Sequence, residues 1–214
     1  MEKPQNYIAV PASGKGPGVL VLPAWWGLND FFKDLCQRLA GEGFVTLAVD
    51  LYHGKIATTV AEAEQLRSKM KGEQVKSDLL AATDQLRALP AVTGQSLGLI
   101  GFSLGAFWGL WLSLERPDAF RAVTVFYGKR NADYTSSQAA YMGHFAETDP
   151  YESASGIKKF EKSLRAAQRP AALYTYPDTG HWFFEQDRKE AYQPQAAELA
   201  WSRTVEFLKA QLKP

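Results

Sequence analysis

Residues 98–106 of this chain are Gly98-Leu99-Ile100-Gly101-Phe102-Ser103-Leu104-Gly105-Ala106. An apolar run typical of a strand leads into a Gly-x-Ser-x-Gly turn, and a helical pattern follows over residues 104–114. This order predicts a nucleophile elbow, in which a tight strand-to-helix turn lifts a serine hydroxyl above the end of a sheet. Glycine suits positions 101 and 105 because the turn brings two backbone segments too close for side chains. Ser103 is therefore the predicted nucleophile, held in a strained backbone conformation.

A second Gly-x-Ser-x-Gly match lies directly upstream, from Gly94 to Gly98. A helix end and a proline-containing loop precede it, and a strand follows it. Because its strand and helix would stand in the wrong order, we interpret this match as the turn into the strand. For Ser103 the alternative is a serine that only caps the following helix.

The composition is that of a single globular domain over residues 1–214, with 46% hydrophobic and 22% charged residues. A net charge of +1 gives no reason to expect nucleic acid or a membrane surface as a partner. No signal-peptide pattern and no apolar run of membrane-spanning length is present. The single cysteine, Cys36, excludes an internal disulfide and is predicted to be a small buried side chain. These features favour a cytoplasmic enzyme.

Apolar strand-like runs alternate with amphipathic stretches, which predicts an α/β fold with a mostly parallel, doubly wound sheet of about seven strands. The predicted strands cover residues 7–10, 18–22, 45–49, 97–102, 122–126, 140–145 and 172–176. The predicted helices cover residues 29–40, 60–71, 75–89, 104–114, 157–167 and 195–212. Residues 131–138 are the most polar irregular stretch and are predicted to form a mobile loop.

Residues suited to chemistry follow several of these strands. In parallel sheets of this kind, ligands bind beyond the carboxyl ends of the strands. The stretches that follow strands are Ala24-Trp25-Trp26-Gly27, Ser103, Tyr127-Gly128, Glu147-Thr148-Asp149 and Asp178-Thr179-Gly180-His181. Their shared position predicts one site at that edge of the sheet.

A serine nucleophile needs a base that takes its proton and returns it to the leaving group. Of the three histidines, His181 follows the last strand and is the predicted base. His53 also follows a strand and could border the pocket, whereas His144 lies inside a strand and is predicted to be structural.

The base in turn needs a carboxylate that fixes its tautomer. Asp149 follows the strand between the nucleophile and the histidine, which gives the chain order Ser103, Asp149, His181. Glu147 and Asp178 are the competing carboxylates. A purely structural role for Asp149, as a helix N-cap, is the other alternative.

The oxyanion of a tetrahedral intermediate needs two donors. The backbone N–H of Leu104 and an N–H of the loop at Trp25 are the predicted pair. Adjacent aromatic residues in the loops predict a mainly apolar substrate pocket. Its predicted lining is Trp25, Trp26, Tyr127, Trp182 and Phe183.

Together these residues resemble the dienelactone hydrolase family of the α/β-hydrolase superfamily, over most of the chain. The resemblance rests on Gly27-Leu28-Asn29, Val49-Asp50-Leu51-Tyr52, Gly101-Phe102-Ser103-Leu104-Gly105-Ala106, Phe126-Tyr127-Gly128, Asp149-Pro150, and Tyr176-Pro177 with Gly180-His181-Trp182-Phe183. It implies an α/β-hydrolase fold without a large cap domain, a monomer, and hydrolysis of a small ester or lactone that needs neither metal nor organic cofactor.

The chain departs from the family pattern at three positions. Ser103 stands where the best-known members carry a cysteine, and Ala24 stands where they carry a glutamate that controls its ionisation. Both changes favour ordinary serine esterase chemistry. Glu185 replaces an arginine that holds the substrate carboxylate, so an anionic dienelactone is disfavoured. Lys129 or Arg130 could supply a different anchor.

The sequence therefore favours a serine hydrolase that acts on a small ester or lactone. A non-catalytic small-molecule binding protein on the same fold is the alternative. Acyl transfer or thioester cleavage by the same residues is a third hypothesis.

Overall fold

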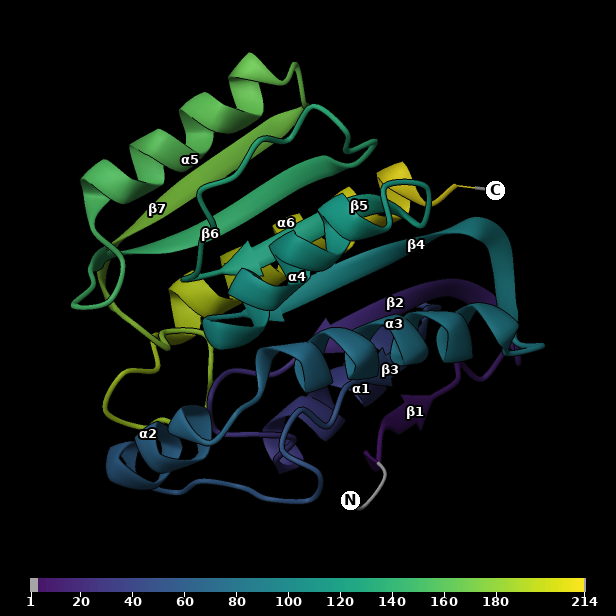
Figure 1. Ribbon diagram of the computed structural model, residues 1–214, viewed down its shortest axis with the longest axis horizontal. Helices are drawn as coiled ribbons and strands as arrows, with labels where there is room; N and C mark the ends of the chain where they lie inside the picture. The colour runs from purple at the N-terminus through teal and green to yellow at the C-terminus, as the bar shows by residue number, and fades with distance from the viewer. Residues whose placement is uncertain (1–3, 214) are drawn as a thin grey trace.

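Seven strands form one twisted sheet at the centre of the computed structural model, which describes residues 4–213 (Figure 1). Their spatial order is β1-β3-β2-β4-β5-β6-β7. The strands are β1 (Tyr7–Ala9), β2 (Gly16–Leu22), β3 (Val45–Ala48), β4 (Val92–Phe102), β5 (Phe120–Phe126), β6 (Ala140–Thr148) and β7 (Ala171–Gly180). Only β1, at the edge, runs antiparallel to its neighbour. The predicted, mostly parallel sheet is confirmed.

Helices cover both faces of this sheet. They are α1 (Asp30–Gly41), α2 (Val60–Ser68), α3 (Gly72–Ala88), α4 (Leu104–Glu115), α5 (Ala154–Ala166) and α6 (Pro194–Gln211). One apolar core contains the buried faces of α1 and α6, and the other contains those of α3, α4 and α5. Alternate residues of β2 serve the two cores, since Val19 and Val21 belong to the first and Leu20 and Leu22 to the second. Such two-sided burial explains the continuous apolar runs in the sequence.

Side-chain caps fix where several helices begin. Asn29 accepts a hydrogen bond from the Phe32 amide at the start of α1, and Ser153 accepts one from the Gly156 amide at the start of α5. Thr59 and Glu62 form a reciprocal capping box at the start of α2. Helix α2 buries only Ala63, because it lies beyond the carboxyl end of β4 rather than on a sheet face.

The structure corrects one sequence prediction. The upstream match from Gly94 to Gly98 is not a turn before the strand but part of β4, which begins at Val92 because Val92 and Thr93 pair with Gly16 and Pro17. The stretch 131–138 is irregular, as predicted, and hydrogen bonds of Tyr134 and Ser137 connect it to neighbouring segments. The Tyr134 hydroxyl donates to the Arg130 carbonyl at 2.8 Å, and Arg169 Nη1 donates to the Ser137 carbonyl at 2.5 Å.

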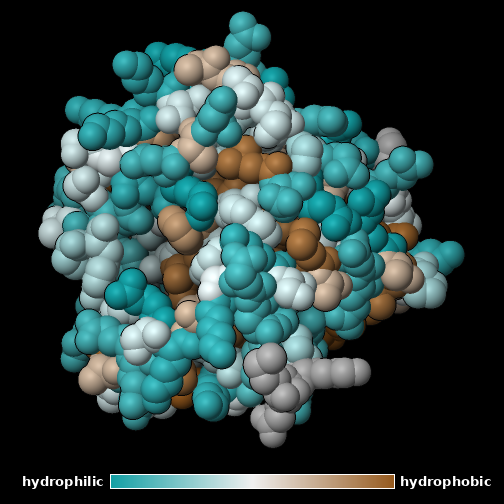
Figure 2. Space-filling view, viewed as in Figure 1, coloured by the Kyte–Doolittle hydropathy of each residue, from teal (hydrophilic) through white to brown (hydrophobic). Residues whose placement is uncertain are grey.

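Hydrophilic side chains dominate the face shown in Figure 2, and apolar side chains are seen mainly in the depressions between them. Within residues 4–213, none of the helices combines the length and the apolar character that a membrane crossing requires.

Gly105 sets how closely α4 approaches the end of β2. A Cβ at this position would lie 2.3 Å from the Leu22 carbonyl oxygen and 2.5 Å from the Pro23 carbonyl oxygen. Because both are backbone atoms, we expect Gly105→Ala to lower the free energy of unfolding by about 2–4 kcal/mol, measured by urea denaturation. Gly41→Ala is the control, since its Cβ would meet no atom within 4 Å. Equal losses in both variants would contradict the prediction.

Candidate active site

Ser103 stands at the sharp turn between β4 and α4. Its backbone has φ 48° and ψ −110°, a strained conformation for a residue with a side chain. Neighbouring backbone holds the turn in place. The Ser103 amide donates to the Phe126 carbonyl at 2.9 Å, and a Cβ on Gly128 would lie 2.7 Å from the Ser103 carbonyl oxygen. The predicted elbow geometry is therefore present.

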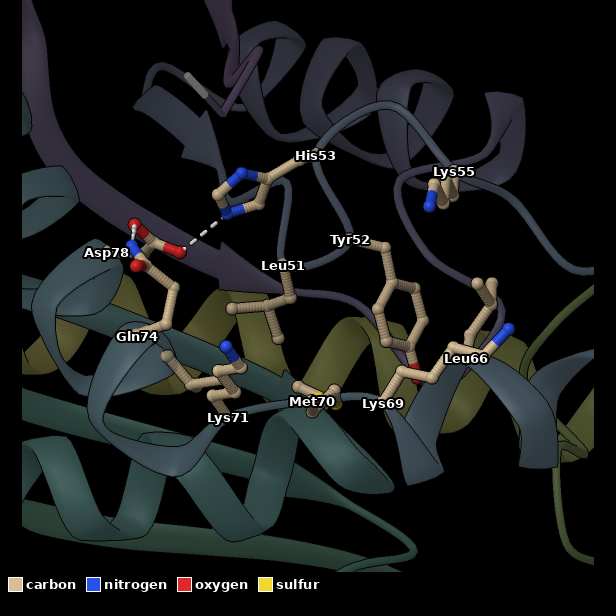
Figure 3. A pocket seen from close by; sticks show the side chains of 11 residues that line it. Leu51, Tyr52, His53, Lys55, Leu66, Lys69, Met70, Lys71, Gln74 and Asp78 are labelled. Carbon is tan, nitrogen blue, oxygen red and sulfur yellow. Dashed lines mark hydrogen bonds and ion pairs between the residues drawn. The ribbon is translucent and has the colours of Figure 1, made fainter. Parts of the chain in front are cut away.

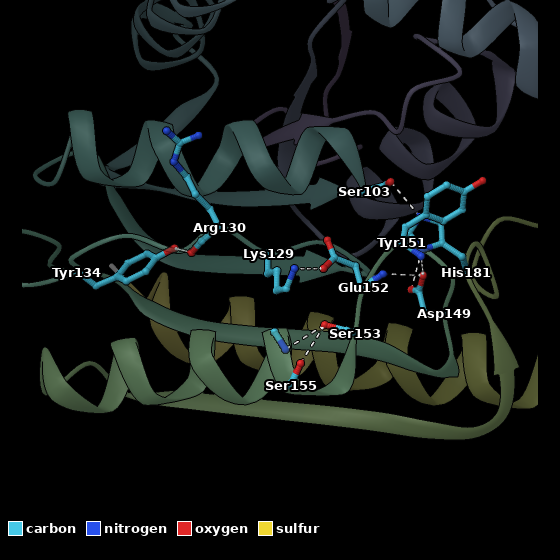
Figure 4. Close-up of polar contacts among 11 residues, drawn as sticks. Ser103, Lys129, Arg130, Tyr134, Asp149, Tyr151, Glu152, Ser153, Ser155 and His181 are labelled. Carbon is cyan, nitrogen blue, oxygen red and sulfur yellow. Dashed lines mark hydrogen bonds and ion pairs between the residues drawn. The ribbon is translucent and has the colours of Figure 1, made fainter.

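Three side chains form a continuous hydrogen-bonded chain at this turn (Figure 4). Ser103 Oγ lies 2.9 Å from His181 Nε2, and His181 Nδ1 lies 2.7 Å from Asp149 Oδ2. The side chains of His181 and Asp149 are only 3% and 2% exposed. An ionised carboxylate can only accept, so Nδ1 carries the proton and Nε2 is left to accept from the serine hydroxyl. This is the arrangement that a general base requires.

Backbone amides hold the Asp149 carboxylate in this orientation. Its Oδ1 accepts hydrogen bonds from the amides of Tyr151 at 2.8 Å and Glu152 at 3.0 Å (Figure 4). The other oxygen, Oδ2, is thereby aimed at His181. The same turn is joined to the loop after β5 by an ion pair between Glu152 and Lys129.

The ends of two paired strands position His181 and Asp149. Thr148 of β6 pairs with Gly180 of β7, and Asp149 and His181 are the next residue on each strand. Just before this pair the register shifts, because β7 contains extra residues between Tyr176 and Gly180. Such a bulge re-aims the chain next to a site.

Both competing carboxylates, Glu147 and Asp178, lie at this bulge, and neither is the hydrogen-bond partner of His181 Nδ1. Glu147 Oε2 accepts from the Asp178 amide at 3.0 Å, and the Asp178 backbone has a φ of 55°. Thr179 Oγ1 donates to the Tyr176 carbonyl at 2.7 Å and accepts from the Glu147 amide at 3.3 Å. Asp149 is thus the carboxylate that the structure places against His181.

His144 has a structural environment, as the sequence predicts. It is fully buried in β6, where Nδ1 lies 2.8 Å from the Tyr176 hydroxyl and Nε2 lies 3.0 Å from Thr204 Oγ1. Burial, with a contribution from the charge of Arg203, lowers the pKa of His144 to about 3. Its imidazole is therefore neutral at ordinary pH.

His53 lies in a separate cavity of about 310 Å³ (Figure 3). Its Nε2 lies 2.8 Å from Oδ2 of the Asp78 carboxylate. The other carboxylate oxygen, Oδ1, accepts a hydrogen bond from Gln74 Nε2. Cys36 is buried, and burial raises the pKa of its thiol to about 12, so the thiol is unreactive. Neither residue borders the cavity at Ser103.

A cavity of about 670 Å³ opens beside Ser103 and His181. The loop after β2, helices α2 and α4, the turn after β6 and the loop after β7 all contribute to its wall. The lining residues beyond Ser103 and His181 are Trp25, Glu64, Arg67, Met70, Gly72, Leu104, Phe107, Trp108, Lys129, Pro150, Tyr151, Glu152 and Trp182. Its size suits a small organic ligand.

The predicted pocket lining needs correction. Of the five aromatic residues predicted to line the pocket, Trp25 and Trp182 do line the cavity. The other three, Trp26, Tyr127 and Phe183, are buried at 2% exposure or less. Their rings pack inward, beneath the site. The Tyr127 ring centroid lies 4.8 Å from that of His181, and Phe183 packs edge-on against Tyr127. These rings lie away from the cavity wall, and Tyr127 packs directly against the ring of His181.

Sequence reasoning missed several lining residues. Phe107 and Trp108 lie one helical turn after Ser103 on α4, and this spacing was an available signal. Glu64 and Arg67 of α2 had no signal, because only the fold brings α2 to this edge. Lys129 lines the cavity but is already paired with Glu152, and Arg130 instead places its guanidinium 4.3 Å from the Phe107 ring centroid.

Both predicted oxyanion donors come from residues that line the cavity, Trp25 and Leu104. Leu104 is the first residue of α4, so its amide has no acceptor within the helix. The positive end of the helix dipole lies at the same point. Hydrogen bonding of these two amides to an oxyanion remains a prediction.

Glu185 does not face the cavity, contrary to the expectation that its charge repels an anionic substrate. Its side chain is fully buried, and Oε1 accepts a hydrogen bond from the Tyr127 hydroxyl at 2.6 Å. Burial raises the pKa of Glu185 from 4.5 to about 8. The carboxyl group is therefore mostly protonated at neutral pH and presents no charge to a ligand.

This buried carboxyl group predicts a pH-dependent stability. The unfolded chain releases the proton near pH 4.5 and the folded chain near pH 8, so the contribution of Glu185 is lost as pH rises through this window. Glu185→Gln stays neutral throughout. We compare the free energy of unfolding of the variant with that of the natural chain, by chemical denaturation at pH 5 and at pH 9. From pH 5 to pH 9 we expect this difference to shift in favour of the variant by on the order of 2–4 kcal/mol. A difference that is the same at both pH values would contradict this.

Known proteins share this sequence and fold. The family model described as "Dienelactone hydrolase family" matches residues 5–212. "Protein usf" of Aquifex pyrophilus is 30% identical over 98% of this chain and 94% of its own length. A Bradyrhizobium protein named "Probable 2-oxo-3-(5-oxofuran-2-ylidene)propanoate lactonase" is 29% identical over 95% of this chain and 88% of its own.

A solved structure agrees with the fold. The dienelactone hydrolase-like promiscuous phosphotriesterase P91, from metagenomic libraries, superposes with a TM-score of 0.87 at 22% identity, over 97% of this chain and 92% of P91. With the strand order above, this likeness confirms the expected α/β-hydrolase fold. The match over residues 5–212 shows that the chain belongs to the dienelactone hydrolase family.

Proposed function

We propose that this chain is a serine hydrolase that cleaves a carboxylic ester or lactone through an acyl-enzyme. The observation that carries the proposal is the continuous chain of hydrogen bonds from Ser103 through His181 to Asp149, beside a cavity of about 670 Å³. Membership of the dienelactone hydrolase family and the lactonase name of the Bradyrhizobium relative support the reaction class.

Acylation begins when Ser103 Oγ attacks the carbonyl carbon of the ester. The hydroxyl proton moves to His181 Nε2 over the 2.9 Å contact, and Asp149 stabilises the resulting imidazolium. The oxyanion accepts hydrogen bonds from the amides of Leu104 and Trp25. Each donor of this kind lowers the barrier by about 3 kcal/mol. His181 then protonates the leaving alcohol as the C–O bond breaks.

Deacylation repeats these roles with water. His181 takes a proton from a water molecule, whose oxygen attacks the acyl carbon, and Ser103 leaves with the proton that His181 returns. The products are a carboxylic acid and an alcohol, which stay joined when the substrate is a lactone. The proposal includes action in the cytoplasm, in line with the single buried cysteine, and as a monomer, as the family resemblance implies.

Labelling with a fluorophosphonate probe, followed by intact mass and peptide mapping, tests the function. We expect one adduct on Ser103 in the natural chain, and none in His181→Ala, because the probe needs an activated serine. Ser96→Ala, which removes the serine of the upstream motif, is the matched control and should be labelled normally. A folded natural chain that takes up no probe would favour the alternative, a non-catalytic binding protein.

A further inference from the structure

Five aromatic side chains line the cavity beside Ser103. Trp25, Tyr151 and Trp182 form one group, in which Trp25 and Trp182 stack at 6.1 Å between centroids and Tyr151 lies 5.6 Å from each. Phe107 and Trp108 of α4 form a second group, with centroids 5.6 Å apart. The Tyr151 ring also lies 4.8 Å from the His181 ring. An aromatic surface therefore reaches the reacting groups themselves.

Two of these rings, Phe107 and Tyr151, are exposed. Among the residues that the structure describes, Phe107 at 39% and Tyr151 at 49% are the only exposed phenylalanine, tyrosine or tryptophan side chains with large apolar area, and both line this cavity. Exposed apolar area gathered at one place marks a binding surface. A ligand that covers these rings would be stabilised by the burial of their apolar surface, which folding leaves exposed to water.

The positive and negative side chains of the cavity wall are equal in number, so their formal charges sum to zero. The wall contains Arg67 and Lys129 as cations and Glu64 and Glu152 as anions. Lys129 is held in an ion pair by Glu152, and Arg67 follows Glu64 by one turn of α2. Glu185 contributes nothing, since it is buried outside the cavity. A carboxylate on the substrate would have to compete with Glu152 for Lys129 and would lose its hydration.

We propose that the preferred substrates are uncharged esters that carry an aromatic ring, on the acyl or the alcohol side. This inference rests on the proposed serine hydrolase function. The ring would pack offset or edge-on against Phe107, Tyr151 and their neighbours. Water supplies the hydroxyl to the acyl group and a proton to the alcohol, so one product is an aromatic acid or an aromatic alcohol.

Two ester series test the proposal at constant carbonyl reactivity. The acyl series is ethyl 3-phenylpropanoate, ethyl hexanoate and ethyl 3-(4-carboxyphenyl)propanoate. The alcohol series is 2-phenylethyl acetate, hexyl acetate and 2-(4-carboxyphenyl)ethyl acetate. In at least one series we expect kcat/KM of the phenyl ester to exceed that of both other members by about tenfold or more, which corresponds to 1.4 kcal/mol.

Variants locate the origin of this preference. The double variant Phe107→Ala with Tyr151→Ala removes two exposed rings, and we expect the ratio of phenyl to alkyl kcat/KM to fall at least about threefold. Leu199→Ala is the control, because it removes a side chain of similar exposure, 46%, from α6 and outside the cavity. It should leave the ratio unchanged. Arg67→Ala should not alter the ranking of the carboxylated esters.

Fluorophosphonate labelling of the same preparations separates the two proposals. Labelled Ser103 with equal rates across both series, or with faster carboxylated or alkyl esters, would overturn the substrate class and leave the hydrolase function intact. Labelling without turnover of any of these esters would do the same. Neither labelling nor turnover in a folded protein would overturn both.

Discussion

Ser103→Ala is expected to lower kcat/KM for ester hydrolysis by about 10⁴-fold or more, because no other hydroxyl group lies against His181 in the described hydrogen bonds. The fold should survive, since among residues 4–213 the Ser103 side chain hydrogen-bonds only with His181, and the turn is held by backbone contacts. Steady-state kinetics measures the loss, and circular dichroism with thermal unfolding verifies the fold.

The control for this variant is Ser96→Ala, at a partly buried position in the first half of β4. It should retain full activity. Turnover of Ser103→Ala within about tenfold of the natural chain would remove Ser103 from the nucleophile's role.

Asp149→Asn is expected to lower kcat/KM by about 10⁴-fold, the size of the effect in a serine protease triad. The asparagine oxygen would keep the two backbone donors, Tyr151 and Glu152, so its amide NH₂ would face His181 Nδ1. An NH₂ group donates, which forces the histidine proton onto Nε2. Nε2 could then no longer accept the proton of Ser103.

The matched control is Asp178→Asn, at the bulge of β7, where only the amide of Asp178 is used. We expect near-normal kinetics, since asparagine also tolerates a positive φ. If Asp149→Asn and Asp178→Asn lost activity equally, the assignment of Asp149 as the orienting carboxylate would be wrong.

The sequence predicted the strands and helices well where apolar patterns define them. Strands β2, β3 and β5 bury nearly every residue, so their apolar runs are continuous. The ends of β6 and β7 were missed, because Glu147, Thr148 and Asp178 are polar and exposed. Backbone pairing holds these residues in the sheet. Because this pairing does not depend on the hydropathy of the side chains, a hydropathy pattern cannot predict it.

The three residues of the hydrogen-bonded chain, Ser103, His181 and Asp149, could be predicted because each follows a strand and each is of a suitable chemical type. The surrounding pocket could not. Whether an aromatic residue in a loop turns inward, as Tyr127 does, or outward, as Tyr151 does, depends on packing from distant segments. The burial of Glu185, and with it the change in its pKa, likewise arises only from the folded environment.

The pairing of Thr148 with Gly180 makes the distance between Asp149 and His181 a property of the sheet ladder. Asp149 and His181 each stand one residue past that pair, so the spacing between adjacent strands sets their separation, and the length of the intervening chain does not. The return loop at residues 167–170 lies at the opposite end of the two strands. Natural variation or design can lengthen that loop, or insert a second domain there, without changing how Asp149 and His181 lie relative to each other.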